Sequence, residues 1–142
     1  MGLSRVWVQT LADGLVRADS IIGITTHPTP AIAGKSSRWL LDVVLPTTTG
    51  SGAAGGWVSS PLHRTLAQTS QPPVNATTDL AGMLARLDTA DAAGVITVER
   101  ESRDDAVAGI RFGFTPFANT DHGDGDPRRS GPDHRRDPAA SA

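Results

Sequence analysis

Residues 38–45 are Arg-Trp-Leu-Leu-Asp-Val-Val-Leu, and Pro46 follows them. A short, nearly continuous run of aromatic and aliphatic side chains is typical of a strand in the interior of a sheet. A proline cannot donate a ladder hydrogen bond, so Pro46 is expected to end the regular pairing. The segment therefore predicts a central strand, and its one carboxylate, Asp42, needs a partner if it is buried.

The segment before this strand predicts a β-hairpin. Residues 6–11 and residues 21–26 are both rich in β-branched or apolar side chains, which are typical of strands. Asp13-Gly14 lies between them and is a strong signal for a tight hairpin turn. Asp19-Ser20 is polar, so we expect the second arm of the hairpin to be interrupted there.

The segments after the central strand predict a loop and further strands. Gly, Ser and Thr dominate residues 47–56, which indicates a flexible connection. Alternating or continuous apolar residues in the others predict strands. The segments are residues 47–56 for the loop, residues 57–68 for a strand interrupted at Pro61, and residues 95–99 and 109–114 for a C-terminal hairpin.

One segment has the apolar spacing of a helix. Leu80, Met83, Leu84 and Leu87 recur at intervals of three and four residues, which places them on one face. Thr77 or Thr78 is positioned to cap the first free N–H groups, and Gly94 is the expected C-terminal stop.

Together these patterns predict the α+β class. We expect a mainly antiparallel sheet of about five to seven short strands, packed by one amphipathic helix. Residues 1–117 are predicted to form a single domain. Residues 118–142 are dominated by Asp, Arg, Gly and Pro and lack large apolar side chains, which predicts a disordered polar tail.

Composition excludes several classes of function. The chain has no cysteine, which removes disulfides, thiol catalysis and every zinc site built on thiolates. A net charge of −2 and a pI of about 6.0 argue against a nucleic-acid binder and against a polybasic membrane patch. Neither a membrane-spanning run nor the apolar segment of a secretion signal is visible, so the expected location is the cytoplasm.

Four residues are candidates for a catalytic or binding role, namely His27, Asp42, His63 and Arg64. The ordinary interpretation makes His63 a solvent-facing strand residue and His27 a loop residue. It gives Asp42 a cross-strand ion pair with an arginine such as Arg38 or Arg64, because a buried carboxylate needs a partner. On this interpretation the chain has no catalytic residue, no metal ligand and no cofactor.

A second interpretation of the same residues remains open. His27 and His63 would meet across strands and bind zinc together with Asp42, although their spacing along the chain does not require it. The protein would then be a small-ligand binder or a hydrolase-like enzyme that uses a cluster of His, Asp and Arg. The relative position of the two histidines and Asp42 in the fold decides between these interpretations.

The N-terminal pattern also carries a resemblance. The apolar strand at residues 6–11, the Asp13-Gly14 turn, the aspartate at Asp19 and the second strand at residues 21–24 follow one another closely. This order resembles that of small uncharacterised actinobacterial proteins that are rich in β-structure. The resemblance implies further strands and a helix downstream. It implies no activity and no functional residue, and the strand pair after the helix and the polar tail depart from it.

A core pattern without a recognisable reactive motif favours a non-catalytic function. The leading hypothesis is therefore an accessory or protein-interaction domain. Such a domain would bind a protein partner, or a second copy of itself, through an exposed strand at the edge of its sheet. No nucleic-acid partner and no membrane association are expected from the charge and the hydropathy of the chain.

Overall fold

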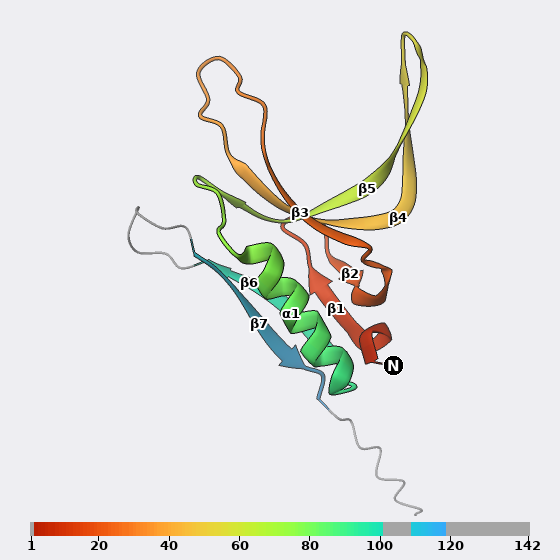
Figure 1. Ribbon diagram of the computed structural model, residues 1–142, viewed down its shortest axis with the longest axis vertical. Helices are drawn as coiled ribbons and strands as arrows, with labels where there is room; N and C mark the ends of the chain where they lie inside the picture. The colour runs from red at the N-terminus through yellow and green to blue at the C-terminus, as the bar shows by residue number, and fades with distance from the viewer. Residues whose placement is uncertain (1, 101–108, 119–142) are drawn as a thin grey trace, which may run out of the picture.

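The computed structural model describes residues 2–100 and 109–118. Within these ranges the chain forms seven strands, one α-helix and two short 3-10 helices, which confirms the predicted α+β class (Figure 1). In chain order the elements are η1 (Gly2–Arg5), β1 (Val6–Gln9), β2 (Leu15–Arg17), η2 (Ala18–Ser20), β3 (Gly23–Pro28), β4 (Trp39–Ala53), β5 (Gly56–Thr69), α1 (Ala76–Thr89), β6 (Gly94–Arg100) and β7 (Ile110–Pro116).

The strands divide into two sheets. The first sheet has the strand order β2-β1-β6-β7, and the second has the order β3-β4-β5. All neighbouring strands are antiparallel except β1 and β6, which run parallel with Val6 opposite Gly94. Figure 1 shows α1 lying along the first sheet, while the second sheet lies beyond the end of β1.

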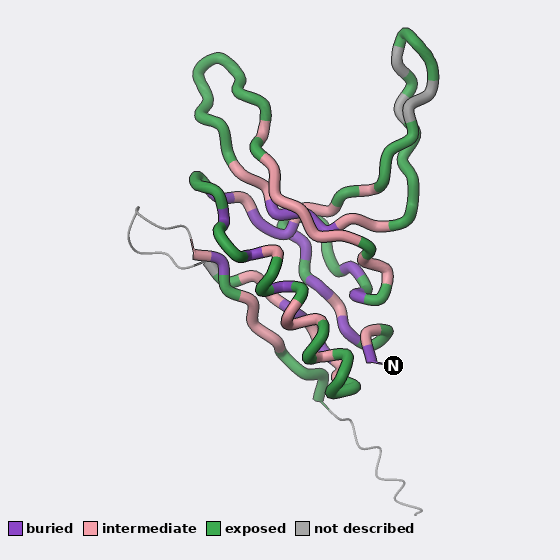
Figure 2. Tube along the Cα trace, in the orientation of Figure 1, coloured by how far each residue is buried: buried purple, intermediate pink, exposed green. Residues whose placement is uncertain are grey.

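The two sheets and the helix share one hydrophobic core. Leu41 and Val43 of β4, Val6 and Val8 of β1, and Leu80 of α1 are fully buried. Figure 2 shows the buried residues gathered where the second sheet meets β1 and the helix. The complete buried cluster is Val6, Val8, Ala18, Leu41, Val43, Leu66, Ala67, Ala76, Leu80, Ile96 and Ile110.

The N-terminal hairpin differs in detail from the prediction. Gln9 pairs with Leu15, so residues 10–14 form a longer loop rather than a two-residue turn at Asp13-Gly14. Thr10 closes this loop, since its N–H donates to Gly14 O at 2.8 Å. The expected interruption at Asp19-Ser20 is confirmed: the chain leaves β2 through η2 and enters the second sheet as β3.

The prediction of a loop at residues 47–56 is wrong. Strands β4 and β5 remain paired as far as Ala53 opposite Gly56, so residues 46–61 form a projecting two-stranded ribbon, called the β4–β5 ribbon below. The tight reversal is possible because Gly56 adopts a φ of 127°, which is open to glycine. The expected irregularity at Pro61 is present as a register shift in the pairing between Leu45 and Thr48.

The helix is confirmed, but its ends differ from the expected ones. It begins after Asn75, which has a φ of 63° and makes no side-chain capping hydrogen bond. The two threonines expected to cap it lie inside its first turn. At the other end the chain reverses through Asp91, with a φ of 50°, and Gly94 is the first residue of β6. A Cβ on Gly94 would lie 2.3 Å from Thr115 O, so close packing against β7 explains this glycine.

Some expectations concern parts of the chain outside the described ranges. Of the predicted polar tail, residues 119–142 lie outside them, so its disorder remains a prediction. None of the helices among the described residues is long and apolar enough to cross a membrane.

The shared core makes a testable prediction for α1. Replacing Leu80, which is fully buried in the core shared by the two sheets, with alanine leaves a cavity there. We expect Leu80→Ala to lower the free energy of unfolding by about 2–5 kcal/mol in urea denaturation. The control is Val74→Ala at an exposed position, for which a change within about 0.5 kcal/mol is expected. Equal effects of the two substitutions would show that α1 does not contribute to the core.

Candidate metal centre

The outer face of the second sheet carries the candidate residues. Successive side chains of a strand point to opposite faces, and Leu41 and Val43 of β4 point into the core. Asp42 lies between them and therefore points to the other face. Its neighbours across the sheet are Thr25 on β3 and Thr65 on β5.

His27 reaches the same face through the register of β3. It pairs with Leu40, which lies two residues before Asp42 on β4 and so shares the face of Asp42. The expectation that His27 is a loop residue is therefore wrong, because strand β3 continues through it to Pro28.

A β-bulge brings His63 to this face. Leu41 pairs with Ala67 but Asp42 pairs with Thr65, so Leu66 is an extra residue in β5. A one-residue shift moves every later side chain of a strand to the opposite face. Without the bulge Arg64 would share the face of Asp42, whereas the bulge places His63 there instead, opposite Val44.

The three side chains converge on one carboxylate oxygen. His27 Nε2 lies 2.8 Å from Asp42 Oδ2, and His63 Nδ1 lies 3.4 Å from the same oxygen. The two imidazole rings meet edge to face, with centroids 6.3 Å apart and an interplanar angle of 79°. One donor atom from each residue lies within 4.8 Å of the other two, a group called the His-Asp-His cluster below.

Burial is uneven across the His-Asp-His cluster. The Asp42 side chain is only 4% exposed, while the side chains of His27 and His63 are 43% and 44% exposed. Asp42 Oδ1 is buried and has no hydrogen-bond partner among the described residues. A buried carboxylate with one unpartnered oxygen is costly, so Asp42 is a group that a further cation would stabilise.

The carboxylate also alters the proton affinity of its neighbour. The hydrogen bond from His27 to Asp42 raises the pKa of the His27 imidazole above its usual value of 6.5. Partial burial opposes this effect but does not outweigh it. In the metal-free protein, His27 therefore tends to hold a proton next to the Asp42 carboxylate.

The fourth candidate residue, Arg64, lies apart from the cluster. Its guanidinium forms an ion pair with Asp13 in the loop between β1 and β2. The expected ion pair between Asp42 and an arginine is therefore wrong, because Asp42 has histidine partners instead. Sequence reasoning also missed the bulge at Leu66. Its signal was the consecutive apolar pair Leu66-Ala67, which breaks the alternation of the strand and is buried at both positions.

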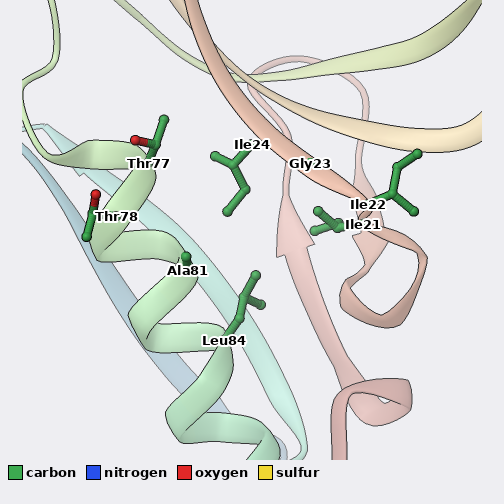
Figure 3. Close-up of a pocket in the computed structure, with 8 residues that line it drawn as sticks. All are labelled: Ile21, Ile22, Gly23, Ile24, Thr77, Thr78, Ala81 and Leu84. Carbon is green, nitrogen blue, oxygen red and sulfur yellow. The ribbon is translucent and has the colours of Figure 1, made fainter.

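An apolar groove lies elsewhere in the described part of the structure. It has a volume of about 520 Å³ and lies between the start of β3 and the first turns of α1 (Figure 3). No titratable side chain lines it, so it offers no acid–base or metal chemistry. Its lining residues are Ile21, Ile22, Gly23, Ile24, Thr77, Thr78, Ala81 and Leu84.

Comparisons with known proteins add no functional assignment. No protein-family model, curated protein or solved structure matches the chain. No activity and no site residue can therefore be carried over from a relative, and the chemistry of the His-Asp-His cluster is inferred from its own geometry.

The raised pKa of His27 predicts a pH dependence of stability in the metal-free protein. A group whose pKa is higher in the folded state stabilises the fold fully below its unfolded pKa of about 6.5, and this contribution is lost as the pH rises through the folded pKa. We expect the stability difference between the original chain and His27→Gln to be largest near pH 5 and to shrink by about pH 9. Thermal unfolding in the presence of a chelator measures it, and a difference that does not vary with pH would contradict the prediction.

Proposed function

We propose that this protein binds a divalent transition-metal ion of the zinc class through His27 Nε2, His63 Nδ1 and the Asp42 carboxylate. The observation that carries the proposal is the buried carboxylate of Asp42, which has one unpartnered oxygen and two imidazole nitrogens beside it. Among the described residues, these form a group of ligand atoms close enough to share one ion.

The distances between the donor atoms fit such an ion after small adjustments. Zinc lies about 2.0–2.2 Å from nitrogen and oxygen ligands, so the ligands of a tetrahedral site are about 3.3 Å apart. In the His-Asp-His cluster, His27 Nε2 and Asp42 Oδ2 are 2.8 Å apart, and no two donor atoms are separated by more than 4.8 Å. Rotations of the two half-exposed imidazoles would change these separations, whereas the buried Asp42 provides a fixed point.

The type of ligand favours transition metals over magnesium and calcium. Two imidazoles and one carboxylate suit zinc, cobalt, nickel or copper, while magnesium and calcium prefer sites made of oxygen atoms. Three protein ligands also leave one position of a tetrahedral ion free. Both histidine side chains are about half exposed, so solvent reaches the site, and the fourth position would be available to a water molecule or to a small ligand.

We therefore place the function in the class of small-ligand binders. The free coordination position is the feature that a hydrolase-like activity would need, since a bound ion lowers the pKa of its water. The groove of about 520 Å³ is not lined by His27, Asp42 or His63, so no substrate is assigned to the His-Asp-His cluster.

Calorimetric titration with Zn²⁺ tests the proposal directly. We expect one ion per chain, and we expect His63→Ala to weaken the affinity by more than about 100-fold, because a ligand matters more than the residues that support it. Asp42→Asn keeps the shape of the side chain and should weaken binding similarly. Co²⁺ provides a visible absorption band as a second readout of the ligand geometry.

The other two histidines of the chain provide the matched control. A His122→Ala and His134→Ala double variant should keep the affinity of the original chain. Absence of Zn²⁺ binding in the original chain would overturn the proposal. The same conclusion would follow if the double variant lost binding while His63→Ala, folded by circular dichroism, retained it.

A separate observation favours a second function, self-association through the β4–β5 ribbon. Residues 46–61 carry no charge, and every residue of this ribbon whose burial is described is exposed. Figure 1 shows the ribbon projecting from the second sheet, away from α1. Isolated two-stranded ribbons are marginally stable, and an uncharged ribbon lacks the lysines that usually block pairing at an edge. We propose a second copy of this chain as its partner.

Sedimentation equilibrium tests the self-association. A charge on the ribbon should oppose pairing with a second ribbon, so Thr49→Lys is expected to raise the dimer dissociation constant at least about tenfold, or about 1.4 kcal/mol. Ala90→Lys, at an exposed position after α1, is the control for the added charge and should have no effect. A chain that is monomeric at every concentration would contradict this second proposal and leave the metal proposal unaffected.

A further inference from the structure

Arg64 lies at a junction between the two sheets. Its guanidinium pairs with the Asp13 carboxylate in the loop between β1 and β2. One residue further along, Thr65 O accepts a hydrogen bond from Leu11 N at 2.8 Å. The loop between β1 and β2 thus contacts two consecutive residues of β5, through the side chain of Arg64 and the carbonyl oxygen of Thr65.

This junction lies beside an interruption in the strand pairing of the second sheet. Strand β5 is an edge strand, so it has a ladder partner on one side alone. The Leu66 bulge interrupts that ladder next to Thr65. His63 lies three residues before Leu66 and 3.4 Å from Asp42 Oδ2, compared with 2.8 Å for His27. Strand β3 is an edge strand as well, but its pairing with β4 has no such interruption, so His63 is the histidine whose position depends more on contacts outside the sheet.

The partner of Arg64 is itself held firmly. Thr10 Oγ1 donates to Asp13 Oδ1 at 2.5 Å, and the Asp13 N–H lies 3.2 Å from the same hydroxyl oxygen. Thr10 is buried, which fixes the loop to the first sheet. The Arg64 guanidinium, followed by the Thr10 hydroxyl, lowers the pKa of the Asp13 carboxyl, so Asp13 stays charged at neutral pH.

We propose that Arg64 is a positioning residue for the metal centre, because its ion pair with Asp13 holds β5 beside the bulge and keeps His63 directed toward Asp42. This inference rests on the proposed metal binding and assigns Arg64 a role without direct contact to the ion. Substitution of a residue that orients metal ligands from outside the coordination sphere typically lowers the metal affinity by about 10- to 100-fold.

The test compares Arg64→Gln with Arg17→Gln. Arg17 forms an ion pair with Asp19, 2.6 Å long and partly exposed, on the first sheet, and it has no contact with the His-Asp-His cluster. We expect Arg64→Gln to weaken Zn²⁺ binding by about 10- to 100-fold and Arg17→Gln to leave it unchanged. The double variant Arg64→Asp with Asp13→Arg reverses the ion pair and should recover most of the lost Zn²⁺ affinity. If Arg64→Gln weakened binding only by lowering the overall stability, the double variant would not recover it.

A readout without metal separates this inference from the proposed function. In the metal-free original chain, the edge-to-face contact of the two imidazoles should give a nuclear Overhauser effect between His27 and His63. Arg64→Gln should weaken this signal and Arg17→Gln should not. If the original chain binds no Zn²⁺, the proposed function fails, but the ring-to-ring signal still decides whether Arg64 positions His63.

Two results would overturn the inference. One is a Zn²⁺ affinity of Arg64→Gln equal to that of the original chain. The other is a ring-to-ring signal that survives in Arg64→Gln, which would mean that the sheet alone positions His63.

Discussion

The carboxylate of Asp42 is the constraint on which the candidate site depends. The Asp42 side chain lies in the apolar first half of β4 and is 4% exposed, yet no lysine or arginine among the described residues forms an ion pair with it. Burial of a charge without a partner is among the largest costs that a fold can carry. The two histidines relieve this cost at one oxygen, and the other oxygen remains without a partner among the described residues. A bound metal ion would give the Asp42 carboxylate the partner that its second oxygen lacks.

The architecture of the second sheet makes this arrangement possible. Its inner face supplies Leu41 and Val43 to the shared core, so β4 cannot shift its register without exposing them. The position of Asp42 is therefore fixed by hydrophobic packing on the opposite face of the same strand. The Leu66 bulge then determines which side chains of β5 lie on the same face as Asp42. Both Leu66 and Ala67 are buried in the core. Packing on one face thus determines the chemistry that is available on the other.

The sequence predicted the elements better than their pairing. The apolar run at β4, the helical spacing in α1 and the need of Asp42 for a partner were all visible in local patterns. The meeting of His27 with His63 was not, because it depends on a bulge and on the register of three strands, both of which are set by the core. The prediction of a loop at residues 47–56 was wrong because their composition is that of a linker, whereas residues 48–53 pair with residues 56–61. The parallel pairing of β1 with β6 joins residues about ninety positions apart, for which no local signal exists.

The topology of the two sheets has a consequence for the order of assembly. All three strands of the second sheet follow one another directly along the chain, whereas β1 of the first sheet must wait for β6. Contacts between residues that are near in sequence have a smaller loop-closure cost and tend to form sooner. His27, Asp42 and His63 have all emerged from the ribosome once the third strand of this sheet has done so, before the helix and the C-terminal hairpin emerge. A nascent chain therefore carries every ligand of the proposed ion well before its first sheet is complete, and an ion captured at that stage would act as a template for the remaining fold.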